Sequence, residues 1–268
     1  TRGRSTALQA ASLVSARLPR ERGRRYTATG WRTLRDGQDM FVHAGGGITA
    51  DGAVDLPYVA IEGKLSVFQM EPPTQDVNEL VAAIRDGLAP LVWLPGKNLA
   101  PLIGFAFRTI FGAPQTSLHP VGPPGSGKTA CTRLAGLQWF APSMHENGWP
   151  ARRSMFSALE ETGDRIKGLL DRMGAAANLP VVVDDFKGAK GEAKLGELQS
   201  VLWNDGARTL GTRTGGSRTT TMPRCGALTT GEVGSSGSSA SRALTIRFDS
   251  ETLLSHARDG EDMGDLMT

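Results

Sequence analysis

Residues 121–130 read VGPPGSGKTA, and this short stretch decides the fold of the chain. It matches the pattern G-x-x-x-x-G-K-[ST] at every fixed position, which Gly122, Gly127, Lys128 and Thr129 occupy. The glycines allow backbone N–H groups to converge on phosphate oxygens, and a helix that begins in the loop adds the positive end of its dipole. The stretch is therefore predicted to be a phosphate-binding loop.

The neighbouring sequence supplies the context that such a loop requires. TSLHPVG, from residue 116, is typical of a buried strand, and GKTACTRLAGLQWF, at 127–140, is typical of a helix. Lys128 is predicted to reach the β- and γ-phosphates of ATP, and the Thr129 hydroxyl to bind Mg²⁺. The predicted nucleotide-binding residues are Gly122, Pro123, Pro124, Gly125, Ser126, Gly127, Lys128 and Thr129.

The second motif is the apolar run VVVDD at 181–185, which ends in two acidic residues. A buried parallel strand reads as a continuous apolar run, and its carboxyl end would deliver Asp184 to the Mg²⁺ shell. Asp185 then stands where a general base for the attacking water is needed, although most such ATPases carry Glu there. Glu160 is another candidate base, but Ser157-Ala-Leu-Glu160 also matches a helix capping box, which we favour.

A threonine pair and two arginines are further candidates for a role in ATP hydrolysis. The strand at 225–230 ends in Thr229-Thr230, so a hydroxyl there could face the γ-phosphate or the water. Arg242 is a candidate arginine finger or sensor, which neutralises charge on the transferred phosphoryl group; Arg247 is a poorer candidate for that role.

An Arg-, Gly- and Thr-rich stretch at 207–224 contains no acidic residue. A hairpin that turns at its central Gly-Gly pair would project Arg213 and Arg218 from the core. In a ring these side chains would line a pore suited to a nucleic-acid backbone, without sequence readout. A solvated basic loop is the alternative interpretation.

The chain has 268 residues, which is enough for an α/β core with a smaller appended module. The predicted fold class is α/β: a P-loop NTPase core with a mostly parallel sheet, preceded by a small β-rich module and a helical segment. The module is expected because short alternating segments at 28–69 are broken by DG and GGG turns. The predicted divisions are 1–25, a basic segment; 26–74, the β-rich module; 75–115, a helical linker; 116–250, the ATPase core; and 251–268, a tail.

Charge and cysteine content narrow the class of protein. The net charge is +3, but residues 1–25 hold seven Arg and one Glu, so this segment carries +6 and the remainder about −3. The segment is predicted to be solvated or interdomain, with a nucleic-acid contact as the alternative. Cys131 and Cys225 have no metal-ligand spacing, and no apolar run reaches the ~20 residues that span a bilayer. These features indicate a cytoplasmic protein with reduced thiols and no membrane partner, and the chain resembles a fragment of a longer one.

Taken in order, these motifs resemble the P-loop, helicase-like ATPase domain of replication proteins from phages, plasmids and integrated elements, which is often fused to a primase. The resemblance lies in GWRTL, LHPVGPPGSGKT, VVVDDF, LTTGEV and SRALTIRFD, over roughly residues 28–250. It implies an ATP- and Mg²⁺-dependent motor that forms a homo-oligomeric ring, expected to be a hexamer. The motor is expected to move on DNA, in single-stranded form. It leaves open whether the ring is of the AAA+ (superfamily-three-like) or the RecA-like type.

The same resemblance implies roles for individual residues. Lys128, Thr129 and Asp184 would hold MgATP, Asp185 would help to activate water, and Thr230 would sense phosphate. Arg242 would act on the nucleotide, in that family from a neighbouring subunit. Any primase domain would lie outside this chain.

Two other functions are consistent with the sequence. An ATP-gated module for oligomerisation or loading would bind ATP and hydrolyse it slowly, as Asp in place of Glu at 185 suggests. A P-loop kinase is the third alternative, with the Arg-rich stretch at 207–224 as its lid.

Overall fold

A computed structural model describes eleven stretches of the chain: residues 25–56, 58–71, 74–93, 96–136, 145–146, 149–150, 156–157, 166–204, 209–211, 217–219 and 222–249. Several sequence predictions fall outside them. These are the basic segment up to residue 24, Glu160, Arg213, and the tail from 251.

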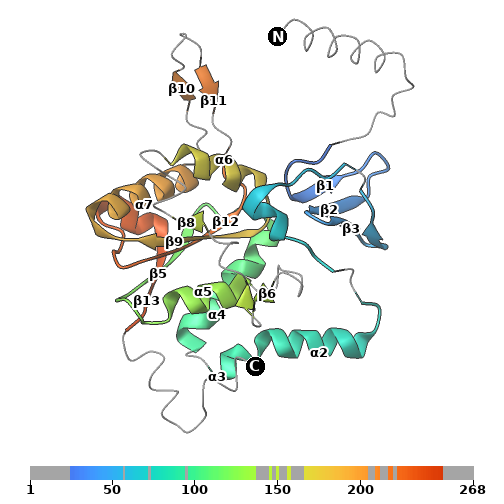
Figure 1. Cartoon of the computed structure of the whole chain (residues 1–268), viewed down its shortest axis with the longest axis horizontal. Coiled ribbons are helices and arrows are strands. Elements are labelled where there is room, and N and C mark those ends of the chain that lie inside the picture. The colour runs from blue at the N-terminus through green and yellow to red at the C-terminus, as the bar shows by residue number, and fades with distance from the viewer. Residues whose placement is uncertain are drawn as a thin grey trace, which may run out of the picture.

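The core of the molecule is a five-stranded sheet in the order β13-β5-β12-β9-β8 (Figure 1). All four pairings between neighbouring strands are parallel. This confirms the predicted α/β class with a parallel sheet. The strands are β5 (Ser117–Val121), β8 (Phe156–Ser157), β9 (Pro180–Phe186), β12 (Gly226–Gly231) and β13 (Ala243–Arg247).

Helices cover both faces of this sheet. In Figure 1, α6 (Lys167–Ala175) and α7 (Gly188–Trp203) lie above it, and α4 (Gly96–Arg108) and α5 (Lys128–Gly136) lie below it. Successive side chains of a strand point to opposite faces. Val181 and Val183 therefore join one hydrophobic cluster, with the leucines of α6 and α7, while Val182 joins the other, with α4 and α5. Burial on both faces explains the continuous apolar run in the sequence.

The segment before the core forms the predicted β-rich module. Its four strands pair antiparallel in the order β1-β2-β3-β4, and a short 3₁₀ helix, η1 (Gly63–Val67), follows them. The turns coincide with the DG and GGG sequences that suggested hairpins. The strands are β1 (Gly30–Thr33), β2 (Asp39–His43), β3 (Gly46–Thr49) and β4 (Gly52–Val54).

This module packs directly against the sheet core and the end of the helical segment. The Thr29 amide donates to the carbonyl of Ala175 at 2.9 Å, and its hydroxyl donates to the carbonyl of Ala177 at 2.9 Å. The indole N–H of Trp31 donates to the carbonyl of Ile110 at 2.9 Å. Buried side chains of β2 and η1 also belong to the same cluster as those of α6 and α7. The domain boundaries stay predictions, but the module and the core share one hydrophobic cluster.

The segment after the β-rich module is helical. Asp76 caps α2 (Val77–Leu88) by accepting a hydrogen bond from the Asn78 amide at 2.7 Å, as an N-cap carboxylate does. A short helix, α3 (Pro90–Trp93), and then α4 follow, and η2 (Thr109–Phe111) continues α4. The chain leaves η2 at Gly112, whose φ of +147° only glycine adopts readily.

The remaining elements are short. β6 (His145–Glu146) pairs antiparallel with β7 (Trp149–Pro150), β10 (Thr209–Gly211) pairs antiparallel with β11 (Ser217–Thr219), and η6 (Gly237–Arg242) precedes β13. Among the described residues, no helix combines the length and the apolar character that crossing a membrane requires.

Both cysteines are buried and free. Burial raises the pKa of the Cys131 thiol to about 11, and it also raises the pKa of Cys225. Both thiols therefore stay protonated near neutral pH and are poor nucleophiles.

Candidate functional site

The carboxyl ends of three parallel strands meet at one edge of the sheet, where the glycine loop at 122–127 begins. Val121 ends β5 and pairs with Gly231 at the end of β12, and Gly231 pairs in turn with Phe186 at the end of β9. In open α/β sheets this edge is where ligands bind. The strand order thus brings the glycine loop, the two aspartates and the threonine pair together.

The glycine loop has the backbone geometry that its sequence predicts. Gly125 and Gly127 have φ angles of +76° and +81°, a region that favours glycine. The loop ends in the first turn of α5, where the Cys131 amide donates to the Gly127 carbonyl at 2.9 Å. The Lys128 ammonium folds back and donates to the carbonyl of Pro123 at 2.9 Å. The helix N-terminus and a cation therefore lie together at the loop, as an anion site requires.

Crowding at the start of the loop also requires glycine. The Gly122 amide donates to the carbonyl of Gly231 at 3.2 Å. A Cβ atom at Gly122 would collide with the carbonyl oxygen of Phe248, and one at Gly231 would collide with that of Phe186. These two glycines let four chain segments approach one another closely.

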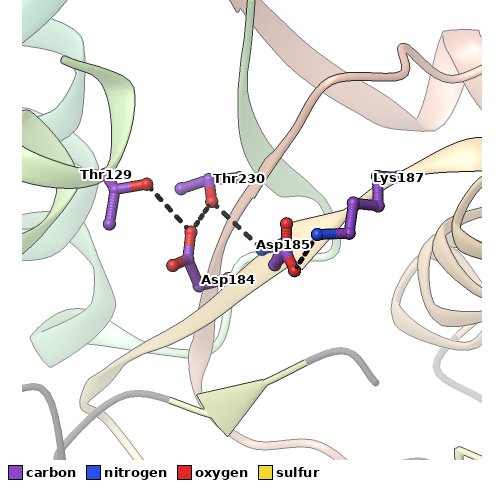
Figure 2. Close-up of polar contacts among 5 residues, drawn as sticks. All are labelled: Thr129, Asp184, Asp185, Lys187 and Thr230. Atoms are coloured by element: carbon purple, nitrogen blue, oxygen red, sulfur yellow. Dashed lines mark hydrogen bonds and ion pairs between the residues drawn. The ribbon is translucent and has the colours of Figure 1, made fainter. Parts of the chain in front are cut away.

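Three side chains from three elements meet at this edge (Figure 2). The Thr129 hydroxyl, in the first turn of α5, donates to the Asp184 Oδ1 at 3.0 Å. The Thr230 hydroxyl, from β12, donates to the same oxygen. Asp184 is thus held between the glycine loop and the neighbouring strand. The sequence predicted these three residues to act at one site, and the structure brings them together.

A bulge in β9 sets the direction of the two aspartates. From Thr229 to Gly231, β12 advances two residues, while β9 advances three, from Val183 to Phe186. Asp185 takes up the extra residue with a φ of +75°, which is unusual for a residue other than glycine. Bulges re-aim side chains and are frequent beside active sites. Sequence periodicity does not reveal this bulge.

The Asp185 carboxylate points away from Asp184 and pairs with Lys187 (Figure 2). The Lys187 Nζ lies 2.9 Å from the Asp185 Oδ2, and this hydrogen bond raises the pKa of Lys187. Both side chains are about half exposed, so solvent screens the pair and it can open readily. The backbone amide of Asp185 donates to the Thr230 hydroxyl at 3.4 Å. Lys187 belongs to none of the sequence motifs, although a lysine two residues after a candidate base is a usable signal.

A buried histidine links the same strands behind the site. His119, in the middle of β5, has its Nδ1 2.8 Å from the Thr229 hydroxyl and its Nε2 2.8 Å from the Val233 carbonyl. Thr229 therefore faces His119, on the opposite side of β12 from Thr230, so that only Thr230 reaches Asp184. No sequence motif includes His119, whose only signal is that it is a polar residue inside an apolar strand.

Burial lowers the pKa of His119 and of His43, and this has a consequence for stability. The unfolded chain takes up protons near the ordinary histidine pKa of about 6.5, while the native chain resists protonation. The free energy of unfolding should therefore fall as pH decreases below about 6.5, by up to ~1.4 kcal/mol per pH unit for each histidine.

His119→Gln should reduce that slope, since glutamine keeps a donor for Val233 and does not titrate. Urea unfolding at several values between pH 7 and pH 5 measures the slope in the variant, in His43→Gln and in the parent chain. An unchanged slope in His119→Gln would contradict the prediction.

The structure does not bring Arg242 to this cluster within one chain. Its guanidinium donates to the Ser200 hydroxyl at 2.8 Å, and the next residue, Ala243, pairs with Ser117 at the start of β5. Arg242 thus lies at the amino edge of the sheet, opposite the glycine loop, and an action on a neighbouring subunit's nucleotide stays a prediction. Arg247 pairs with Val121 and lies at the edge where the loop begins.

The basic stretch contains an antiparallel pair of strands, as the sequence suggested. In β10 and β11, Leu210 lies opposite Arg218, and Gly211 opposite Ser217. In Figure 1 this pair projects away from the sheet beyond α6. The Gly-Gly turn and Arg213 lie outside the described residues. Nucleic-acid binding by Arg213 and Arg218 stays a prediction.

The donors at the edge suit a hard cation. A threonine hydroxyl and a carboxylate are oxygen ligands of the kind that Mg²⁺ prefers, and Mg²⁺ commonly completes its shell with phosphates and water. In the described ranges there is no cluster of three or more His, Cys, Asp or Glu side chains that could hold a metal by themselves. Thr129 and Asp184 therefore fit a Mg²⁺ ion that arrives with a phosphate ligand.

No protein-family profile matches the chain, and no curated protein matches it. Among solved structures, JCV helicase has a TM-score of 0.37 and 18% identity, over 68% of this chain and 56% of the other. An active helicase described as SCCmec type IV Cch has a TM-score of 0.46 and 16% identity, over 96% of this chain and 46% of the other. This chain therefore spans about half the length of each.

Proposed function

We propose that this chain is an ATP-hydrolysing motor that assembles into a ring and acts on DNA, as the helicase or translocase part of a mobile-element replication protein. The observation that carries the proposal is the meeting of Thr129, Asp184 and Thr230 beside the glycine loop. A hydroxyl at the start of a loop-to-helix turn and a strand-end carboxylate are the two ligands that P-loop ATPases use for Mg²⁺.

The loop residues would bind the triphosphate. Backbone N–H groups at 125–129, at the N-terminus of α5, would donate hydrogen bonds to the phosphate oxygens. Lys128 would exchange its contact with the Pro123 carbonyl for the β- and γ-phosphates, because a phosphate attracts the ammonium more strongly than a carbonyl does. Mg²⁺, held by Thr129 and Asp184, would supply neutralisation of the charge that develops on the γ-phosphate.

Asp185 would accept a proton from the attacking water, and Thr230 would orient that water. Asp185 can do so only when its carboxylate is not fully occupied by Lys187. The pair is exposed and easily opened, so the base is available when the site rearranges. Its backbone link to Thr230 connects the position of the base to the strand that contacts Asp184.

The DNA and ring parts of the proposal rest on charge and position. The β10–β11 pair projects from the core (Figure 1), and the sequence from 207 to 224 carries arginines without a balancing acid. Such a projection would contact phosphates without reading bases. Arg242 lies at the edge away from its own loop, a position consistent with action on the nucleotide of a neighbouring subunit.

An ATP-gated assembly module is the second candidate, favoured by the Asp185–Lys187 ion pair. A short acidic side chain whose carboxylate is occupied by a lysine reaches an attacking water less often, and hydrolysis would then be slow. In that case ATP binding would drive assembly with little turnover.

ATP hydrolysis measured with and without single-stranded and duplex DNA tests the proposal, with Lys128→Ala as the blank. We expect DNA to stimulate turnover and Lys128→Ala to lower it by about 10²–10³-fold, since a phosphate-stabilising charge contributes this much. Turnover unaffected by Lys128→Ala would refute a site in the glycine loop.

An Arg213→Ala, Arg218→Ala double variant tests the DNA contact in the same assay. It should retain the basal rate and lose most of the stimulation by DNA, and its residual stimulation should be less sensitive to salt. ATP binding with turnover indifferent to DNA, together with assembly on a non-hydrolysable analogue, would favour the assembly module instead.

A further inference from the structure

A cavity of about 470 Å³ opens beside the start of the glycine loop. Its walls are Gly122 and Pro123 of the loop, the turn around Ser235, and the end of β13 with the two residues that follow it. The cavity lies on the β13 side of β5, whereas Asp184 and Thr230 lie on the β12 side. The glycine loop thus has the three-residue cluster on one side and this cavity on the other.

The position of the polar cluster of Thr129, Asp184 and Thr230 determines which end of a bound nucleotide faces β9. The proposed Mg²⁺ ligands, Thr129 and Asp184, lie toward β9 and would hold the terminal phosphates there. A triphosphate is a linear chain, so the nucleoside must leave the loop at the opposite end. That end faces β13 and the cavity.

The wall from β13 is polar on one face for a simple reason. Side chains alternate along a strand. Ile246 and Phe248 therefore pack into the hydrophobic cluster that includes residues of α4 and α5. The alternate residues Thr245, Arg247 and Asp249 line the cavity. They present a hydroxyl, a planar guanidinium and a carboxylate in one row.

Ser235 also lines the cavity and contributes a buried hydroxyl oxygen. Within the described part of the chain, its hydroxyl oxygen is buried and has no hydrogen-bond partner. Buried polar atoms generally have a partner, and a ligand with hydroxyl or ring-nitrogen groups would supply one.

We propose that this cavity binds the ribose and base of the nucleotide whose phosphates the glycine loop holds. Arg247 stacks on the base, as a guanidinium does on a flat ring, and Asp249 accepts a hydrogen bond from a ribose hydroxyl. The inference rests on the proposed nucleotide site, and it adds the residues that distinguish a nucleoside triphosphate from bare triphosphate.

Calorimetric titration with ATP and with inorganic tripolyphosphate, both with Mg²⁺, tests the phosphate site in the glycine loop separately from the nucleoside site in the cavity. Arg247→Ala should raise the Kd for ATP by about tenfold and leave that for tripolyphosphate within about twofold. Lys128→Ala should weaken both ligands, and Arg85→Ala, an exposed arginine on α2, should change neither.

The outcomes are distinct. If Lys128→Ala leaves both affinities unchanged, the nucleotide site itself is wrong, and the inference fails with it. If Lys128→Ala weakens both but Arg247→Ala weakens neither, or weakens both equally, only the cavity assignment is overturned. Asp249→Asn, which keeps the shape of the side chain, should also weaken ATP alone; an effect on both ligands or on neither would count against the assignment.

Discussion

Asp184→Asn should slow ATP hydrolysis at saturating Mg²⁺ by about 10²–10³-fold, because it removes the carboxylate charge that would hold the metal. The asparagine side-chain oxygen can still accept hydrogen bonds from Thr129 and Thr230, so the packing at the sheet edge should persist. ATP binding should remain measurable, with a weaker dependence on Mg²⁺. Steady-state rates and calorimetric titration of ATP at several Mg²⁺ concentrations test both parts.

The matched control for this variant is Asp86→Asn, an aspartate near the end of α2 and remote from the site. It makes the same chemical change and should leave the rate within about twofold of the parent chain. A rate for Asp184→Asn within threefold of the parent at the same Mg²⁺ concentration would refute the proposed metal ligand.

Gly231→Ala should lower the free energy of unfolding by about 3 kcal/mol, an overpacking cost at the upper end of the usual range. The added Cβ would collide with the backbone carbonyl of Phe186 and also crowd the Phe186 side chain and the His119 ring. A backbone atom cannot rotate away as a flexible side chain can, so β9 and β12 must separate. Because Thr230 and the Gly122 contact lie beside this point, ATP hydrolysis should fall as well.

Gly104→Ala is the control for this change. In α4 a Cβ at Gly104 meets no atom within 4 Å, so alanine should stabilise the helix by about 1 kcal/mol relative to glycine. Urea unfolding of both variants should therefore give shifts of opposite sign. A Gly231→Ala variant as stable as its parent would contradict the crowding at the sheet edge.

Much of the fold could be predicted from local patterns. The strands β5, β9 and β12, the helix α5 and the helices between 75 and 115 occur where the residue patterns indicated, with ends displaced by a few residues. The hairpins of the β-rich module occur where DG and GGG turns stand in the sequence. These features depend on neighbouring residues, which the sequence contains directly.

The candidate site could be predicted only in part. Thr129, Asp184 and Thr230 were singled out from motifs, and the structure places them in contact. Arg242 was singled out by the same reasoning and lies at the other edge of the sheet. A motif gives the type of residue near a strand, but the end of the sheet at which that residue lies depends on strand register.

The sequence by itself determined the glycine loop, the acid-ended strand and the α/β class, because each follows from residue types at fixed local spacing. Only the tertiary structure decided that β12 lies between β5 and β9, and hence that Thr230 reaches Asp184. It also decided the bulge that turns Asp185 toward Lys187. These features arise from pairing between segments far apart in the chain, where long-range register outweighs local preference.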